Sequence, residues 1–284
     1  MKFINMKRQP YLSWMMKPFV FFLLFVLVSC SEKPNEEETP KQPNILFIFT
    51  DDHAFQAISA YQSRLADLAP TPNIDRIAAK GILFNKAYVT NSICAPSRAS
   101  VLTGTHSHVN GHRTNADTFD GSQITFPKLL RENGYKTALI GKWHLKSVPT
   151  GFDHWEILPG QGHYYNPDII SATDTTIAEG YVTDIITDKS LKWLSENQDS
   201  GKPFLLMLQH KAPHRKWEKG PEHLDLYEAL TFPEPDNLFD DYATRGTAAK
   251  TQDMSINKTM DLASDLKIWT DENKKGPVFN RTYG

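Results

Sequence analysis

Two adjacent carboxylates, Asp51 and Asp52, stand directly after an apolar stretch, residues 44–49, and Thr50. A short apolar stretch rich in Ile and Phe is typical of a strand that is buried on both faces. Adjacent carboxylates at the end of such a strand repel each other, and their burial is costly unless a cation neutralises them. Calcium and magnesium prefer oxygen-rich sites of this kind. The residues alone leave two interpretations open, a metal site and a solvated Asp-Asp turn.

A cysteine, Cys94, precedes residues 96–102, whose sequence predicts a helix with Pro96 in its first turn and Gly104 at its end. The amides at the N-terminus of a helix stabilise negative charge on a nearby group. Cys94 could therefore be an activated nucleophile, a redox thiol or a buried structural residue. The residue alone does not choose among these interpretations.

Two further apolar stretches end in basic side chains. Lys142 and His144 follow one of them, and His210 and His214 follow the other. A lysine stabilises negative charge that spreads over a transferring group, and an imidazole can move a proton near neutral pH. Taken without further information, His210 and His214 could equally be histidines of a surface loop.

The elements that must position these residues alternate between strands and helices. Four apolar stretches are expected to form strands: residues 44–49, 82–89, 135–140 and 204–209. Four stretches with helical spacing are expected to form helices: residues 72–80, 96–102, 126–133 and 181–197. This alternation predicts an α/β fold with a mostly parallel sheet sandwiched by helices. Because ligands bind beyond the carboxyl ends of such strands, the polar groups named above are expected to converge there.

The composition excludes some classes of partner. The chain has 284 residues and a formal net charge of −2, which suits one large or two small globular domains. It has no basic stripe and no charge excess that would indicate nucleic-acid binding. An anionic substrate would have to be met by local positive charge. The only cysteines are Cys30 and Cys94, and neither has the appearance of a disulfide framework residue.

The N-terminal residues have the pattern of a bacterial lipoprotein leader. Residues 1–29 combine a basic start with the apolar stretch 19–28, which is too short to span a bilayer as a mature helix, and they end just before Cys30. We expect cleavage before Cys30 and lipidation of its thiol, although a plain secretory signal is the alternative. Residues 30–42 are rich in Glu, Lys, Pro and Asn and predict a flexible tether. The expected location is the cell envelope, in the periplasm or on the outer-membrane surface.

Residues 94–104 read Cys-Ala-Pro-Ser-Arg-Ala-Ser-Val-Leu-Thr-Gly. They match the signature C-x-P-S-R-x-x-x-L-T-G at every fixed position. The chain therefore resembles the type I, formylglycine-dependent sulfatases of the alkaline-phosphatase-like superfamily, over residue 43 to about residue 250. The resemblance implies that a separate maturation enzyme oxidises Cys94 to formylglycine. In this family the aldehyde hydrates to a gem-diol, one hydroxyl attacks sulfur and displaces the alcohol, and loss of the other proton then releases sulfate.

The resemblance also implies roles for the other polar residues. Asp51 and Asp52, with the converted Cys94, match the first metal ligands of the family, commonly of calcium, with magnesium possible. Arg98 matches the arginine that orients the formylglycine.

The basic residues match the substrate side of the family's active site. Lys142 matches the lysine that binds sulfate oxygens, and His144 matches the histidine that assists the gem-diol. His214, in Lys-Ala-Pro-His, matches the histidine that protonates the leaving alcohol, with His210 as the competing substrate-binding candidate.

One part of the family's pattern is not found in this sequence. The family's metal site needs a further pair, Asp followed by Asn, Gln or His, on a later strand, and a further lysine. Asp236-Asn237 lies in a proline-framed loop and is not expected to be that pair. We therefore expect residues 43–284 to be a partial, C-terminally truncated catalytic domain with an incomplete metal site, and the 284 residues alone to have little or no activity.

Several stretches resemble the bacterial N-acetylglucosamine-6-sulfatases: residues 106–111, 151–155 and 231–246. The expected substrate is thus the 6-O-sulfate of N-acetylglucosamine in a sulfated glycan. Residues His163, Tyr164 and Tyr165 could line a sugar subsite or simply pack at the surface. Two alternatives remain, a formylglycine-dependent phosphodiesterase or phosphonate hydrolase of the same superfamily, and an inactive glycan-binding lipoprotein.

Overall fold

The computed structural model describes residues 42–268. The predicted leader, Cys30 and the tether up to residue 41 lie outside this range, as do residues 269–284 of the predicted catalytic domain. Within the part that is described, none of the helices has both the length and the apolar character needed to cross a bilayer.

A six-stranded sheet in the order β1-β6-β2-β3-β4-β5 forms the centre of the described fold. Its strands are β1 (Ile45–Phe49), β2 (Lys136–Lys142), β3 (His154–Leu158), β4 (Asp168–Ser171), β5 (Thr175–Ile177) and β6 (Phe204–Gln209). Neighbours from β1 to β3 pair in parallel, and β4 and β5 add antiparallel strands at one edge. The predicted mostly parallel α/β sheet is confirmed.

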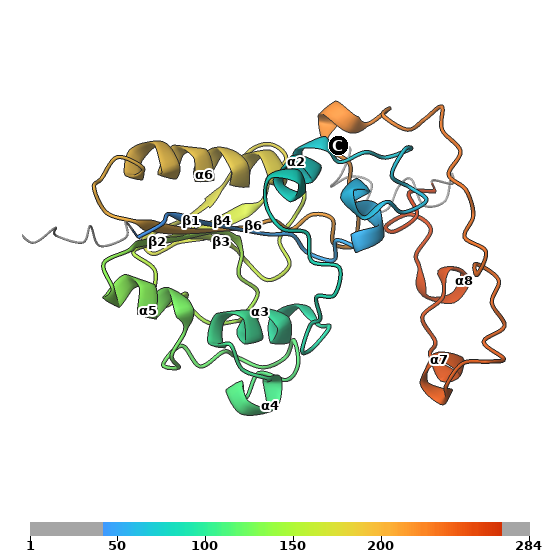
Figure 1. The fold of residues 1–284 in the computed structure, drawn as a ribbon, viewed down its shortest axis with the longest axis horizontal. Helices are drawn as coiled ribbons and strands as arrows, with labels where there is room; N and C mark the ends of the chain where they lie inside the picture. Colours follow the sequence, from blue (N-terminus) through green and yellow to red (C-terminus); the bar gives the residue numbers. More distant parts are fainter. Residues whose placement is uncertain (1–41, 269–284) are drawn as a thin grey trace, which may run out of the picture. The chain divides into compact units, whose positions relative to one another are not determined.

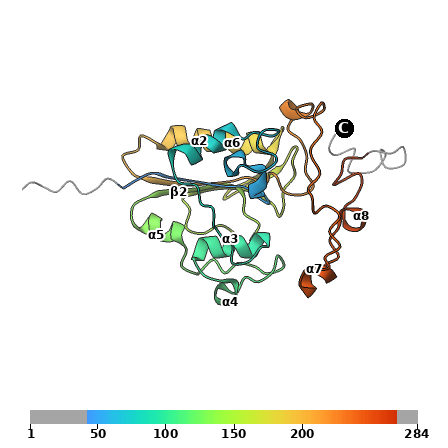
Figure 2. The same cartoon turned by 45° about the vertical axis from the view of Figure 1, so that its right-hand side comes forward.

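Helices cover both faces of the sheet, as Figures 1 and 2 show. On one face lie α2 (Pro72–Lys80) and α6 (Val182–Asn197), and on the other lie α3 (Cys94–Thr103), α4 (Ser107–Asn110) and α5 (Phe126–Glu132). The shorter elements are η1 (Phe55–Ala57), η2 (Ser59–Tyr61), η3 (Pro221–His223), α7 (Thr247–Thr251) and α8 (Ile256–Thr259). The sandwich of helices around the sheet follows from strands whose two faces are both apolar.

The core consists of two apolar layers separated by the sheet. Along β6, Leu205 and Met207 join one layer, whereas Leu206 and Leu208 join the other. Successive side chains of a strand point to opposite faces, so a continuous apolar run fills both layers. β6 is therefore buried on both faces and holds the centre of the fold.

The prediction that the first strand is buried on both faces is wrong for β1. Leu46 and Ile48 are 47% and 48% exposed, while Ile45 and Phe47 pack against the core layer on the opposite face. β1 is an edge strand of the described sheet, with β6 as its neighbour. An apolar run predicts burial from composition, but burial of the second face needs a covering element, and the described residues leave that face half open.

The predicted strand over residues 82–89 is absent from the described fold. These residues adopt no regular structure, and Ile82, Phe84 and Tyr88 are 77%, 66% and 86% exposed. A strand exists only when another strand accepts its hydrogen bonds. The apolar pattern of residues 82–89 was therefore not enough to predict a strand, because no described strand pairs with them.

Candidate active site

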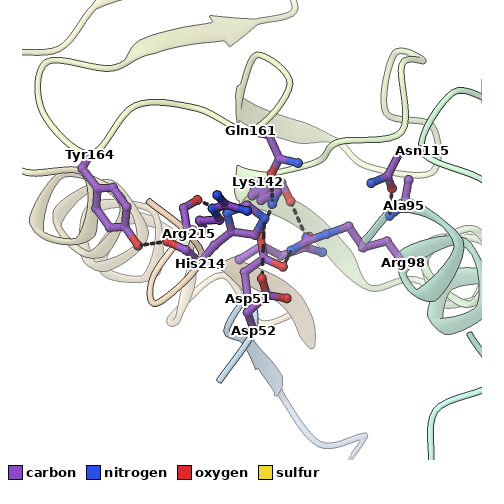
Figure 3. A network of polar contacts seen from close by, with 11 residues as sticks. Asp51, Asp52, Ala95, Arg98, Asn115, Lys142, Gln161, Tyr164, His214 and Arg215 are labelled. Atoms are coloured by element: carbon purple, nitrogen blue, oxygen red, sulfur yellow. Dashed lines mark hydrogen bonds and ion pairs between the residues drawn. The ribbon is translucent and has the colours of Figure 1, made fainter. Parts of the chain in front are cut away.

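The functional candidates gather where neighbouring parallel strands end. Asp51 follows β1, Gln209 is the last residue of β6, and Lys142 is the last residue of β2. These three strands are adjacent in the sheet, so their ends bring the three side chains into one cluster. Figure 3 shows Asp51 and Lys142 of this cluster, together with Arg98. The expectation that the polar groups converge at the carboxyl ends is confirmed.

Gly141 lets the end of β2 approach β6 closely. Its φ is +113°, and a Cβ at this position would lie 1.9 Å from the carbonyl oxygen of Gln209. Only glycine accommodates both the backbone conformation and the contact. The glycine thus determines where the next residue, Lys142, enters the site.

Lys142 is a buried cation held between two acceptors. Its side chain is 0% exposed, and its Nζ donates to Asp51 and to the side-chain oxygen of Gln161. Burial lowers the pKa of Lys142, and the pairing with Asp51 opposes that shift. Gln161 was missed by the sequence analysis. It lies in the loop after β3, between Gly160 and Gly162, so its position after a parallel strand was the available signal.

Arg98 is the second buried cation, and it joins α3 to the strand ends. It is 4% exposed. Its Nη1 donates to the carbonyl oxygen of Lys142 at 2.6 Å and to Oε1 of Gln209 at 2.5 Å, and its Nη2 lies 3.5 Å from Oδ1 of Asp51. The guanidinium also lies 5.2 Å from the centre of the Phe49 ring. Arg98 therefore contacts all three strand ends.

These two cations determine the charge of Asp51. Burial alone would raise the pKa of this carboxyl, but Arg98 and Lys142 outweigh burial and hold the pKa below its usual range. Asp51 is therefore ionised at neutral pH, and its carboxylate is paired with two buried cations.

Cys94 is the first residue of α3, which begins two residues earlier than the predicted helix over residues 96–102. The helix start is fixed by Asn115, whose Oδ1 accepts a hydrogen bond from the amide of Ala95 at 3.0 Å. Burial raises the pKa of the Cys94 thiol, and Lys142 opposes the shift only in part. The unmodified thiol is thus a weak nucleophile, which argues against an activated-cysteine enzyme.

Donor atoms that could hold a cation lie around Cys94. One ligand atom each of Asp51, Cys94 and His214 lies within 4.8 Å of the others. Asp52 lies beside them, with its Oδ2 3.6 Å from Nε2 of His214. The carboxylates are the donors that a hard divalent cation prefers, whereas a thiol is not. An oxygen at position 94 would bring the donor set into agreement with such a cation.

The three candidate histidines, His144, His210 and His214, differ in the charged groups that surround them. His214 lies among the charges of the site, whereas burial is the cause of the lowered pKa of His210. His144 follows β2 and lies within the influence of Lys142, Arg98, Asp51 and His214. Burial, with Lys142 and Arg98, lowers the pKa of His144 to about 4, so its imidazole is neutral at pH 7.

Two more residues support the loop that carries His214. Tyr164 is 4% exposed and donates from its hydroxyl to the carbonyl oxygen of His214 at 2.6 Å, so it packs rather than offering an open sugar surface. Lys211 is buried with its Nζ 4.6 Å from the centre of the Tyr164 ring. Burial and the nearby Lys142 lower the pKa of Lys211 to about 8.

Asp236 and Asn237 lie in an exposed turn and take no part in the donor cluster.

Comparisons with a family model and with known proteins all indicate the same family. The sulfatase family model matches residues 43–271. An N-acetylglucosamine-6-O-sulfatase of Bacteroides thetaiotaomicron is 52% identical over 260 residues, covering 90% of this chain and 46% of that protein. An N-acetylgalactosamine-6-sulfatase of the dog is 30% identical over 268 residues, covering 81% of this chain and 48% of that protein.

A solved structure has the same fold. The structure of BT4656 in complex with its substrate D-glucosamine-2-N,6-O-disulfate superposes with a TM-score of 0.79 at 52% identity, covering 86% of this chain and 49% of that chain. The present chain thus spans about half the length of the relatives that it matches. With the signature at residues 94–104 and the family match over most of its length, the chain belongs to the sulfatase family.

Proposed function

We propose that this protein hydrolyses the 6-O-sulfate ester of glucosamine-type sugars, with Cys94 as the precursor of a formylglycine. The observation that carries the proposal is the cluster at the strand ends, in which Cys94 lies close to Asp51 and His214 while Lys142 and Arg98 pair with Asp51. The substrate class is supported by the 52% identical relative, an N-acetylglucosamine-6-O-sulfatase, and by the similar structure that binds D-glucosamine-2-N,6-O-disulfate.

The buried cations suit a sulfate ester. A sulfuryl group spreads negative charge over several oxygens, and Lys142 and Arg98 supply two cations in a site from which water is largely excluded. In the proposed complex Lys142 exchanges part of its contact with Asp51 for a sulfate oxygen, and Arg98 orients residue 94. Electrostatic stabilisation that is already in place when the substrate arrives needs no rearrangement during the reaction.

The two histidines would move the protons. His214 is proposed to give a proton to the leaving sugar oxygen, because it lies within 4.8 Å of Cys94 and carries a second nitrogen toward the site. His144 is proposed to accept the proton that is lost as sulfate departs, because its neutral imidazole is able to act as a base. When present, the formylglycine supplies, through its hydrate, the hydroxyl that takes up the sulfuryl group.

A divalent cation is proposed at Asp51 and Asp52, with calcium preferred and magnesium possible. The oxygen of a converted residue 94 would join the two carboxylates as a ligand. A hard cation takes six to eight oxygens, so the described carboxylates supply only part of its coordination.

Sulfate release from three sugars tests this function. We expect a full-length form, produced together with a formylglycine-generating enzyme, to release sulfate faster from 6-sulfated N-acetylglucosamine than from a 2-sulfated uronate or galactose-4-sulfate. The mass of the peptide that contains Cys94 shows in the same sample whether the thiol was converted. The variant Cys94→Ala is the control and should be inactive. The reverse order of substrates would refute the substrate class, and turnover with an unmodified cysteine would refute the mechanism.

We further propose that the mature protein is a lipoprotein of the cell envelope, anchored through Cys30. The basic start, the apolar stretch 19–28 and the position of Cys30 support this proposal. The protein should be found in the membrane fraction of a bacterial host, and Cys30→Ser should release it into the soluble fraction. Equal amounts of both forms in the membrane fraction would contradict lipidation at Cys30.

A further inference from the structure

His214 is held on two sides by groups that contribute nothing to the donor cluster itself. Its carbonyl oxygen accepts the hydroxyl hydrogen of Tyr164 at 2.6 Å, and its Nδ1 makes a hydrogen bond to the carbonyl oxygen of Arg215, as Figure 3 shows. A carbonyl oxygen can only accept, so Nδ1 must carry the hydrogen. Nε2, which lies 3.6 Å from Oδ2 of Asp52, is then the nitrogen that faces the site. It gives a proton to the leaving oxygen from the imidazolium form, in which both nitrogens carry hydrogen, and Nδ1 keeps its hydrogen throughout.

The carbonyl that orients the imidazole belongs to a residue that is itself fixed. The guanidinium of Arg215 pairs with Asp265 through two hydrogen bonds, Nε to Oδ1 at 2.7 Å and Nη2 to Oδ2 at 2.5 Å. Nη2 also donates to the carbonyl oxygen of Thr259 at 3.2 Å. A two-point contact between guanidinium and carboxylate fixes their relative orientation as well as their distance.

Asp265 is an unusually restrained partner for an otherwise exposed arginine. The side chain of Asp265 is 0% exposed, whereas that of Arg215 is 41% exposed. Oδ2 of Asp265 also accepts the amide hydrogen of Asp261 at 2.8 Å. The hydrogen bond from Arg215 holds the pKa of Asp265 below its usual range, so the buried carboxylate is ionised. If Arg215 moved away, a buried charge would lose its cationic partner, which is costly.

We propose that Asp265 is a positioning residue for His214, acting through Arg215 to fix which imidazole nitrogen faces the reacting ester. Fifty residues separate Arg215 from Asp265, so a segment remote in the sequence determines the orientation of the proton donor. The kinetic importance of this contact rests on the proton-donor role proposed above for His214, whereas its effect on the imidazole does not.

The orientation of the ring is measured directly by two-bond ¹H–¹⁵N correlation spectra of the chain labelled with ¹⁵N-histidine, recorded at pH 8, where the imidazole is neutral. The variant His214→Gln identifies the signals of His214. We expect these signals to report a hydrogen on Nδ1 in the unsubstituted chain and a mixture of both tautomers in Asp265→Asn.

The matched control is Asp240→Asn. Asp240 pairs with Arg245 through both Nε and Nη2, at 3.0 and 2.8 Å, and these hydrogen bonds do not involve His214 or Arg215. The control should leave the His214 signals unchanged. If Asp265→Asn fails to fold, Arg215→Lys removes the two-point contact while keeping the positive charge, and the same mixture is expected.

The rates of hydrolysis of two sulfate esters then test whether the orientation of His214 affects the reaction. In a full-length form that releases sulfate, Asp265→Asn should slow hydrolysis of 6-sulfated N-acetylglucosamine at least tenfold. It should slow nitrophenyl sulfate, whose leaving group needs no proton, less than threefold, since proton donation contributes about 10²–10⁴-fold. A hydrogen on Nε2 in the unsubstituted chain, unchanged signals in Asp265→Asn, or equal slowing of both esters would overturn the inference. Absence of sulfate release from every ester would instead refute the proposed function, and the spectra would still decide the positioning role.

Discussion

Replacing Arg98 with methionine should lower the free energy of unfolding by about 3–5 kcal/mol, the usual cost of breaking a buried ion pair on one side. Methionine keeps much of the volume of the side chain but removes all donors. The carbonyl oxygen of Lys142, Oε1 of Gln209 and the carboxylate of Asp51 would each lose a partner. Urea denaturation followed by tryptophan fluorescence measures the difference, and the midpoint of thermal unfolding should fall by roughly 10 °C.

Arg245→Met is the matched control for this experiment. Arg245 also makes a two-donor contact with one aspartate, but its side chain is 51% exposed. Exposed pairs of this kind contribute less than about 1 kcal/mol. A loss of similar size in the two variants, or a loss below about 1 kcal/mol for Arg98→Met, would show that Arg98 does not hold the strand ends together.

Acid should unfold the protein well above the pH at which its carboxylates titrate. Five imidazoles of the described chain have pKa values lowered from 6.5, chiefly by burial: His53, His112, His144, His210 and His214. Between these folded-state pKa values, about 4 for His144, and 6.5, the unfolded chain binds more protons than the folded chain. Stability from these groups is therefore fully present above pH 6.5 and is lost as the pH falls toward 4.

The slope of the unfolding free energy against pH counts the protons taken up. One proton corresponds to about 1.4 kcal/mol per pH unit, and His144, with its folded-state pKa of about 4, should alone contribute close to one proton near pH 5. His112 is 1% exposed, and neither ring nitrogen has a hydrogen-bond partner in the described structure. His112→Leu should thus reduce the slope by up to one proton. A flat profile between pH 7 and 5 would contradict the buried neutral state.

The site residues whose positions could be predicted from the sequence are those that directly follow a strand. The apolar stretch that ends at Gln209 was predicted with the observed limits, because β6 is apolar on both faces and its pattern needs no partner to be recognised. Asp51, Lys142 and His214 were expected to meet for the same reason. Parallel strands place their carboxyl ends together, whatever the details of the loops.

The features that could not be predicted from the sequence depend on contacts between residues that are far apart in the chain. β4 and β5 are short, and β5 is exposed, so only their antiparallel pairing defines them as strands. Gln161 is a single amide in a glycine-rich loop, and nothing local distinguishes it from any other loop residue. The contact of Asp265 with Arg215 spans fifty residues and involves ordinary surface residue types. Such contacts follow from the finished fold rather than from local periodicity.

Among the described residues, β1 is an edge strand, and this edge could pair with a strand of another polypeptide segment. Its outer edge presents backbone groups in an orderly row, beside the half-exposed Leu46 and Ile48, and such an edge readily accepts another strand. A guest strand running parallel to β1 would finish next to Asp51 and Asp52, where β1 itself finishes. The last residues of that guest would then lie beside the carboxylates of the candidate site. The exposed edge of β1 would thus determine the side from which the residues of an added strand approach the site.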